Sequence, residues 1–145
     1  MVIDTVKLEK GRDIFKKISQ SNEIKNTFKS LIDRPSLENN EYGIGICSKI
    51  KSRTAGNSLI MTSPCIEIGC KAPPICPENS KLVADFHTHL KRLKPTEEDM
   101  GITIDRKLNI SCIGTIEDNK KMVKCYYPYF HKRRIFTEDI GMINV

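Results

Sequence analysis

Two histidines and an aspartate are the residues of this chain whose type and spacing could hold a metal ion. The stretch from Leu82 to Asp99 reads LVADFHTHLKRLKPTEED and contains His87 and His89, two of the three histidines present. Most isolated His-x-His pairs are ordinary surface or core residues. Imidazole nitrogens with a carboxylate oxygen nevertheless suit zinc, and a catalytic zinc site uses three protein ligands and leaves one position open. The stretch predicts a metal site formed by His87, His89 and Asp99.

A strand and a helix start must bring these three side chains together. The apolar residues before His87 predict a strand, and the side-chain period of two places His87 and His89 on the same face of it. Thr96 is a good N-cap, and Asp99 falls at the third helical position, the partner position of a capping box. We therefore expect the strand end and the helix start to face each other.

Glu41 begins the stretch EYGIGIC, which predicts a glycine-containing strand well before the histidines. The set of Glu41, His-x-His and Thr-x-x-Asp resembles the JAMM (MPN-plus, JAB) zinc metalloproteases, whose pattern is Glu, His-x-His and Ser-x-x-Asp. The resemblance covers roughly Glu41 to Tyr127. It implies that His87, His89 and Asp99 bind Zn²⁺, that Glu41 is the general acid and base, and that Thr96 replaces the serine that stabilises the oxyanion.

The same resemblance implies the reaction, the partner and the fold. Family members hydrolyse an amide or isopeptide bond at the C-terminus of a ubiquitin-like modifier or sulfur-carrier protein. Such a substrate docks its extended tail by adding a strand, here at the edge of the Glu41 strand or at the Pro64–Ser80 segment. The expected fold class is α/β (mixed α+β), a curved mixed sheet flanked by helices in the cytidine-deaminase-like JAB/MPN arrangement, with residues 1–145 forming one domain.

Two departures from the family pattern leave other functions open. Leu90 stands where the family usually has proline, and the run between His89 and Thr96 is one residue shorter than is common. The shorter run would either be harmless or draw Asp99 out of ligand range. The alternatives are a catalytically inactive MPN-type scaffold and a zinc hydrolase of small peptides. Glu38 is the second candidate for the general base. Too few residues follow His89 for an amidohydrolase-type barrel of about 250 residues.

Charge and hydropathy restrict the compartment and the partners. The net charge is +6, from 24 basic and 18 acidic residues. No apolar run suits a signal peptide or a membrane span, so we expect a cytoplasmic protein without membrane contact. Basic clusters at residues 91–94 and 131–134 are either solvated surface or a means of steering an acidic partner. Nucleic acid is an unsupported partner, because the aromatic residues are not interleaved with basic ones.

Six cysteines are many for a cytosolic enzyme. The gaps between Cys65, Cys70 and Cys76 are not those of a zinc knuckle, so these three residues are left open as disulfide partners or metal ligands. Cys47, Cys112 and Cys125 lie in strand-like runs, and we expect them to be small buried hydrophobic residues.

Periodicity predicts the remaining elements. The aromatic residues Tyr126, Tyr127, Tyr129 and Phe130 favour edge packing over a binding surface. The expected elements are helices over 11–31, with a break at Ser21–Asn22, and over 97–107, strands over 42–51, 58–62, 109–116 and 122–127, a hairpin turn at 117–120, and a helix or strand over 136–145.

Overall fold

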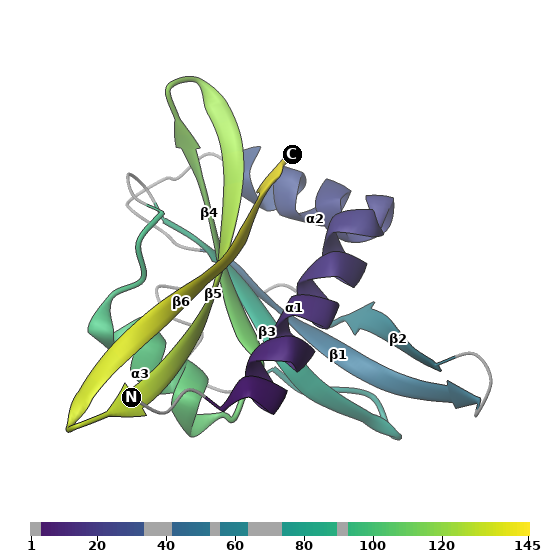
Figure 1. Cartoon of the computed structure of the whole chain (residues 1–145). Coiled ribbons are helices and arrows are strands. Elements are labelled where there is room, and N and C mark those ends of the chain that lie inside the picture. The colour runs from purple at the N-terminus through teal and green to yellow at the C-terminus, as the bar shows by residue number, and fades with distance from the viewer. Residues whose placement is uncertain (1–3, 34–41, 53–55, 64–73, 90–92) are drawn as a thin grey trace.

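The computed structural model describes residues 4–33, 42–52, 56–63, 74–89 and 93–145, which contain one six-stranded sheet and three helices (Figure 1). This arrangement confirms the predicted class, a mixed sheet flanked by helices. No helix among these residues is long and apolar enough to cross a membrane. The elements are α1 (Thr5–Gln20), α2 (Asn22–Asp33), β1 (Gly43–Ser52), β2 (Gly56–Met61), β3 (Ser80–Thr88), α3 (Glu97–Asp105), β4 (Ile110–Glu117), β5 (Lys120–His131) and β6 (Arg134–Asn144).

Helix α1 begins six residues before the Gly11 start that the sequence predicted. The carboxylate of Asp4 accepts hydrogen bonds from the backbone N–H groups of Val6 (3.1 Å) and Lys7 (3.2 Å) and so caps the helix. The early turns bury one large apolar residue, Leu8, so the hydrophobic pattern alone understates their length. The predicted break is present, because the Ser21 hydroxyl accepts from the N–H of Ile24 at 3.2 Å in the first turn of α2.

The strands lie in the order β2-β1-β3-β4-β5-β6. Only β3 and β4 run parallel, and α3 lies between them in the chain. Strand β1 is therefore an interior strand, paired with β2 on one side and β3 on the other. The expectation that a substrate tail adds to the edge of the Glu41 strand is wrong for the part from Ile46 onward, where β2 already occupies that edge.

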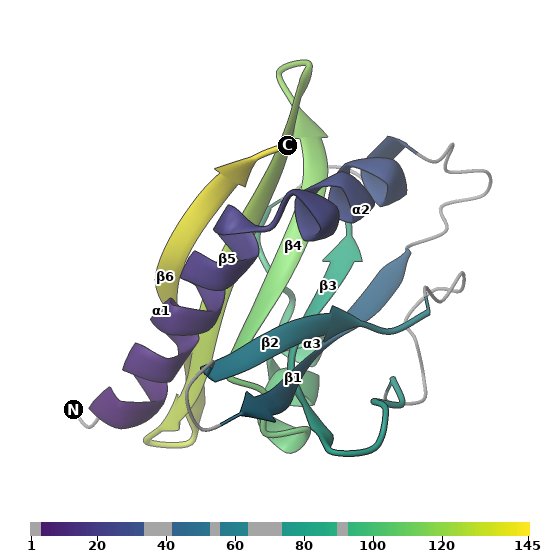
Figure 2. The ribbon, with the colours of Figure 1, turned by 90° about the vertical axis from the view of Figure 1, so that its right-hand side faces the viewer.

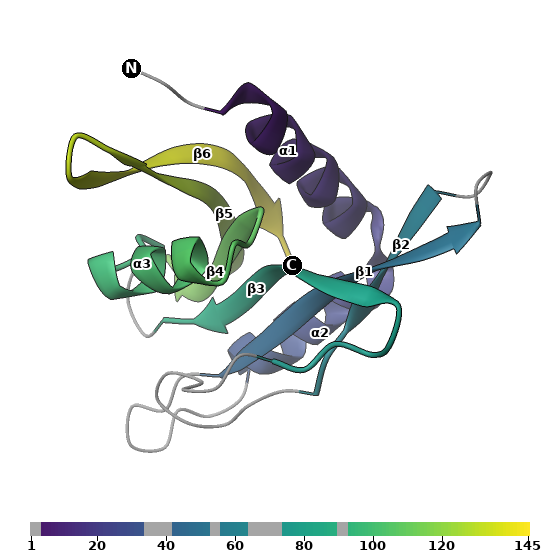
Figure 3. The same ribbon diagram turned by 90° about the horizontal axis from the view of Figure 1, so that it is seen from below.

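The two faces of the sheet have different covers. Phe86 of β3 is 1% exposed and stacks on Phe28 of α2, with 4.1 Å between ring centroids. Helices α1 and α2 cover this face and enclose the main core (Figure 2). Because neighbouring strand residues point to opposite faces, Asp85 and His87 point the other way, and His87 contacts Asp99 of α3. Figure 3 shows α3 on the other side of the sheet from α1.

The last segment, left open between helix and strand, is strand β6, which pairs with β5 along its length. The hairpin between them turns at Lys132 and Arg133, both at positive φ, and it carries most of the aromatic residues. Tyr126 and Tyr127 are each 6% exposed and confirm the packing interpretation, whereas Phe130 is 62% exposed.

Cys112 of β4 and Cys125 of β5 are fully buried in the main core, as the sequence predicted, but they form a disulfide that it did not predict. The two residues are register partners on adjacent antiparallel strands, with Cα atoms 4.0 Å apart. The disulfide was missed because each strand was considered by itself, whereas it is the pairing of the two strands that places one thiol opposite the other.

Candidate metal centre

The end of β3 and the start of α3 bring together the three predicted ligands. The Nε2 atoms of His87 and His89 lie 2.9 Å apart. Oδ2 of Asp99 lies 3.1 Å from Nε2 of His89 and 3.3 Å from Nε2 of His87. The three side chains are only 10–19% exposed, so they form a half-buried cluster of two nitrogens and one oxygen.

The spacing of these three atoms fits a small tetrahedral cation. Zinc bonds of about 2.0–2.1 Å at tetrahedral angles separate neighbouring ligand atoms by about 3.3–3.4 Å. The observed edges of 2.9, 3.1 and 3.3 Å need only a slight outward adjustment to reach that value. Donors of this kind suit zinc and other first-row metals, whereas Mg²⁺ and Ca²⁺ prefer oxygen ligands alone.

A capping box holds Asp99 at this position, as the sequence predicted. The Thr96 hydroxyl accepts a hydrogen bond from the backbone N–H of Asp99 at 3.1 Å, and Oδ2 of Asp99 accepts one from the N–H of Thr96 at 3.0 Å. The oxygen that completes the cap is therefore also the one that faces the histidines. The run between His89 and Thr96 is short, yet Asp99 lies beside both imidazoles.

Electrostatics favour an ionised Asp99. Burial acts to raise the pKa of this carboxyl, but hydrogen bonds from His87 and His89 and from the backbone at Thr96 lower the pKa well below its usual value. The group is thus a carboxylate at neutral pH, which is the form that binds a metal.

The predicted general base, Glu41, lies outside the described residues, as do Glu38 and Leu90. The residue after Glu41 is firmly placed: the N–H of Tyr42 donates to the Thr88 hydroxyl at 3.0 Å, and the carbonyl of Tyr42 accepts from the N–H of Thr88 at 2.8 Å. Gly43 is the register partner of His87. The start of β1 is therefore fixed beside the segment that carries both histidines.

Asp85 is an acidic residue of this face that the sequence analysis did not single out. Its Oδ1 accepts a hydrogen bond from the Ser111 hydroxyl at 2.6 Å. Burial raises the pKa of Asp85, while the charge of His87 and the Ser111 hydrogen bond oppose the increase. The spacing Asp85-x-His87-x-His89 was the available signal, because a period of two places all three side chains on one face.

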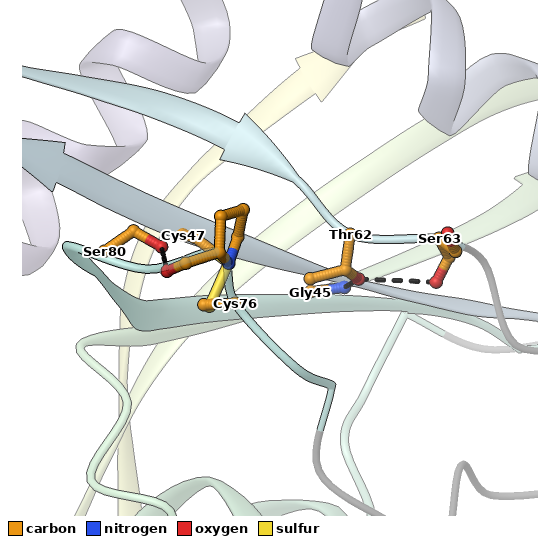
Figure 4. The surroundings of a disulfide bond; sticks show 7 residues. Gly45, Cys47, Thr62, Ser63, Cys76 and Ser80 are labelled. Carbon is orange, nitrogen blue, oxygen red and sulfur yellow. Dashed lines mark hydrogen bonds between the residues drawn. A yellow bond between two sulfur atoms is a disulfide. The ribbon is translucent and has the colours of Figure 1, made fainter.

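A second disulfide lies on the same face of the sheet. Cys47 of β1 is bonded to Cys76 of the segment before β3, across 29 residues of sequence (Figure 4). Pro74 lies so close to Gly45 that a Cβ on the glycine would be 2.7 Å from the Cβ of Pro74. The Thr62 hydroxyl accepts from the N–H of Gly45 at 2.9 Å. The segment from Pro74 to Cys76 is thus held against the strand that pairs with β3.

This pairing corrects and extends the cysteine predictions. Cys47 is fully buried as expected, but it is a disulfide partner and not a free hydrophobic residue. Cys76 pairs outside the 65–76 segment, and it is not available as a metal ligand. Cys65 and Cys70 lie outside the described residues.

Of the predicted basic clusters, Lys91 and Arg92 also lie outside the described residues.

Comparison of the chain with protein-family models, with curated proteins and with solved structures found no significant match. The residues of the site therefore carry the evidence for a function.

Proposed function

We propose that this protein is a zinc-dependent metalloprotease of the JAMM type with the JAB/MPN fold, which hydrolyses an amide or isopeptide bond. The observation that carries the proposal is the triangle of two imidazole nitrogens and one carboxylate oxygen, with edges of 2.9–3.3 Å. His87, His89 and Asp99 would bind the zinc. When bound there, zinc supplies Lewis-acid chemistry and lowers the pKa of water to about 7.

The other proposed roles belong to Glu41 and Thr96. Glu41 accepts the proton of the attacking water and delivers it to the leaving amine, the role of a positioned general acid and base. The Thr96 hydroxyl donates a hydrogen bond to the carbonyl oxygen as negative charge develops on it. Thr96 is exposed at the helix start, and its oxygen already accepts from Asp99, so its own hydrogen remains to be donated.

The proposed substrate is the C-terminal tail of a ubiquitin-like modifier or a sulfur-carrier protein, free or conjugated. An extended tail needs a walled channel beside the metal. The segment from Pro74 to Cys76 supports this requirement, because it is fixed by a disulfide on the face that carries His87. We also propose that the protein acts in the cytoplasm.

Zinc content tests the site before any substrate is known. We expect about one zinc per chain by elemental mass spectrometry, and its loss in His89→Ala. Glu41→Gln should keep the zinc and lose hydrolysis of ubiquitin-like conjugates, because the amide cannot accept the proton. Full turnover by Glu41→Gln would refute the assignment of the base and direct attention to Glu38.

The alternative function is that of an inactive scaffold, suggested by the short run before Thr96. Absence of zinc after reconstitution of the wild-type protein would favour it. Zinc that is bound and lost in His89→Ala, without cleavage of any ubiquitin-like conjugate, would favour the hydrolase of small peptides instead.

A further inference from the structure

A cavity of about 810 Å³ lies between α1 and the strands β1, β2 and β3. Four α1 residues at helical spacing line it: Lys10, Asp13, Ile14 and Lys17. This helix covers the face of the sheet opposite to α3. The cavity is therefore separate from the metal centre, and nothing in the proposed hydrolysis uses it.

Positive charge dominates the rim of this cavity. Lys10, Lys17, Lys49 and Lys81 line it from three different elements, and Asp13 is the one acidic residue among the lining residues that the structure describes. Within the described part of the chain, no ion pair involves Lys10, Lys49 or Lys81. The ammonium groups of these three lysines around one cavity repel each other, and an anion placed between them relieves that repulsion.

Three apolar residues of the lining, Ile14, Leu59 and Val83, form what we call the floor of the cavity, and the other lining residues are polar. Ile14 and Val83 are 9% and 7% exposed, and Leu59 lies beside them. The side chains of Asn79 and Asn109 add amide donors and acceptors. Polar residues outnumber the apolar ones in this lining, so the cavity is more polar than most small-molecule sites, as suits a ligand with both an apolar and a charged part; its volume lies within the usual range of about 300–1,000 Å³.

We propose that this cavity binds a nucleotide, with the base on the apolar floor and the phosphate groups among the lysines. The lysines favour phosphate, because an ammonium acts on it as a point charge, and among the described residues no arginine fork for a planar carboxylate lines the cavity. The volume and the apolar floor call for an organic group beside the phosphates.

Isothermal titration calorimetry with ATP tests the proposal, beside adenosine and inorganic tripolyphosphate. We expect ATP to bind more tightly than either fragment, and its affinity to fall as salt screens the lysines. Lys10→Ala and Lys81→Ala should each weaken ATP roughly fivefold, the effect of one partly screened charge pair. Lys29→Ala, an exposed lysine of α2 outside the cavity, is the matched control and should leave the affinity unchanged.

Asp13→Asn gives the sharpest test, because it removes the negative charge and should tighten ATP binding severalfold. Weaker ATP binding in Asp13→Asn would contradict the placement of the phosphate groups among the lysines beside Asp13. Equal affinity of tripolyphosphate and ATP would refute the role of the apolar floor, and unchanged binding in both lysine variants would refute the site. Because ATP could also bind through a metal held by His87, His89 and Asp99, His89→Ala serves as a control, and it should bind ATP with unchanged affinity. Loss of ATP binding in this variant would place the nucleotide at the metal centre and refute the cavity as its site.

Discussion

Replacing Asp99 by alanine would test whether one carboxylate both caps α3 and binds metal. Its Oδ2 accepts from the N–H of Thr96 at 3.0 Å and lies 3.1 Å from Nε2 of His89. Thr96→Ala is the matched control. It removes the hydroxyl half of the capping box, while the backbone N–H at position 96 can still hold the carboxylate. Both variants lose a cap interaction, but only Asp99→Ala loses a metal ligand.

The expected magnitudes follow from these contacts. Loss of an N-cap costs about 1 kcal/mol, which lowers the melting temperature of a chain of this size by about 4 °C. Both variants should show this decrease in the presence of a chelator, and Asp99→Ala should also lose the stability that comes from the contacts of its carboxylate with His87 and His89. Zinc at a free concentration 100 times its Kd should stabilise the wild-type protein by about 2.7 kcal/mol, or by about 10 °C. Thr96→Ala should keep this increase and Asp99→Ala should lose most of it.

Thermal unfolding followed by circular dichroism, with chelator and with buffered zinc, measures both quantities in the same samples. A full zinc-dependent increase in Asp99→Ala would refute the assignment of Asp99 as a ligand. Loss of the increase in Thr96→Ala would show that the hydroxyl is needed to position the carboxylate, which the remaining backbone hydrogen bond argues against.

Three further predictions concern stability. Replacing Cys47 and Cys76 by alanine should lower the free energy of unfolding by about 3.5 kcal/mol, and replacing Cys112 and Cys125 should lower it by about 3 kcal/mol. The first disulfide closes a loop of 29 residues and the second a loop of 13. Equal urea midpoints for these variants and the wild type would contradict this prediction. Gly45→Ala should cost about 1–3 kcal/mol by pushing against Pro74, whereas Gly101→Ala, inside α3 with no neighbour within 4 Å of its Cβ, should stabilise by up to about 1 kcal/mol. The pKa of Asp99 is lowered below 3.8 in the folded metal-free protein, so its contribution to stability is present above about pH 4 and is lost as the pH falls further. Between about pH 6 and pH 3, Asp99→Asn should therefore lose less free energy of unfolding than the wild type, as measured by urea unfolding. Equal losses would contradict the lowered pKa of Asp99.

The cluster of His87, His89 and Asp99 could be predicted from the sequence because each of its signals is local. His87 and His89 share a face through the period of a strand, and Thr96 with Asp99 forms a capping box over four residues. One further step was needed, namely that the strand end and the helix start face each other. The short connection between them, from His89 to Thr96, leaves few other arrangements.

The disulfides show where the sequence signal was present and where it was absent. The predicted hairpin turn pairs Glu117 with Lys120, and this register also places Cys112 opposite Cys125. Combining the turn with the period of two would have found that pair. No such register connects Cys47 to Cys76, because the path of the chain before β3 depends on tertiary contacts such as Pro74 on Gly45.

The cavity beside α1 was also beyond sequence reasoning, for a related reason. Its lysines come from α1, β1 and β3, and they meet only after the helix crosses the sheet. The start of α1 was missed as well, because Asp4 caps a turn that carries little hydrophobic pattern. Long-range meetings of polar surface residues leave no periodic trace in a single sequence.

The two disulfides and the metal centre are related by the order of the strands. His87 lies on β3 and His89 directly follows this strand. The neighbours of β3 are β1 and β4, and each of them carries one cysteine of a disulfide. Cys47 fixes β1 to the segment that leads into β3, on the face of the metal centre, and Cys112 fixes β4 to β5 on the opposite face. Ligands on a strand between two cross-linked neighbours have little freedom to spread when no metal is bound, and such preorganisation favours a precise site. Reduction should therefore weaken zinc affinity as well as stability, and unchanged affinity in the reduced protein would show that the capping box and the sheet hydrogen bonds are sufficient.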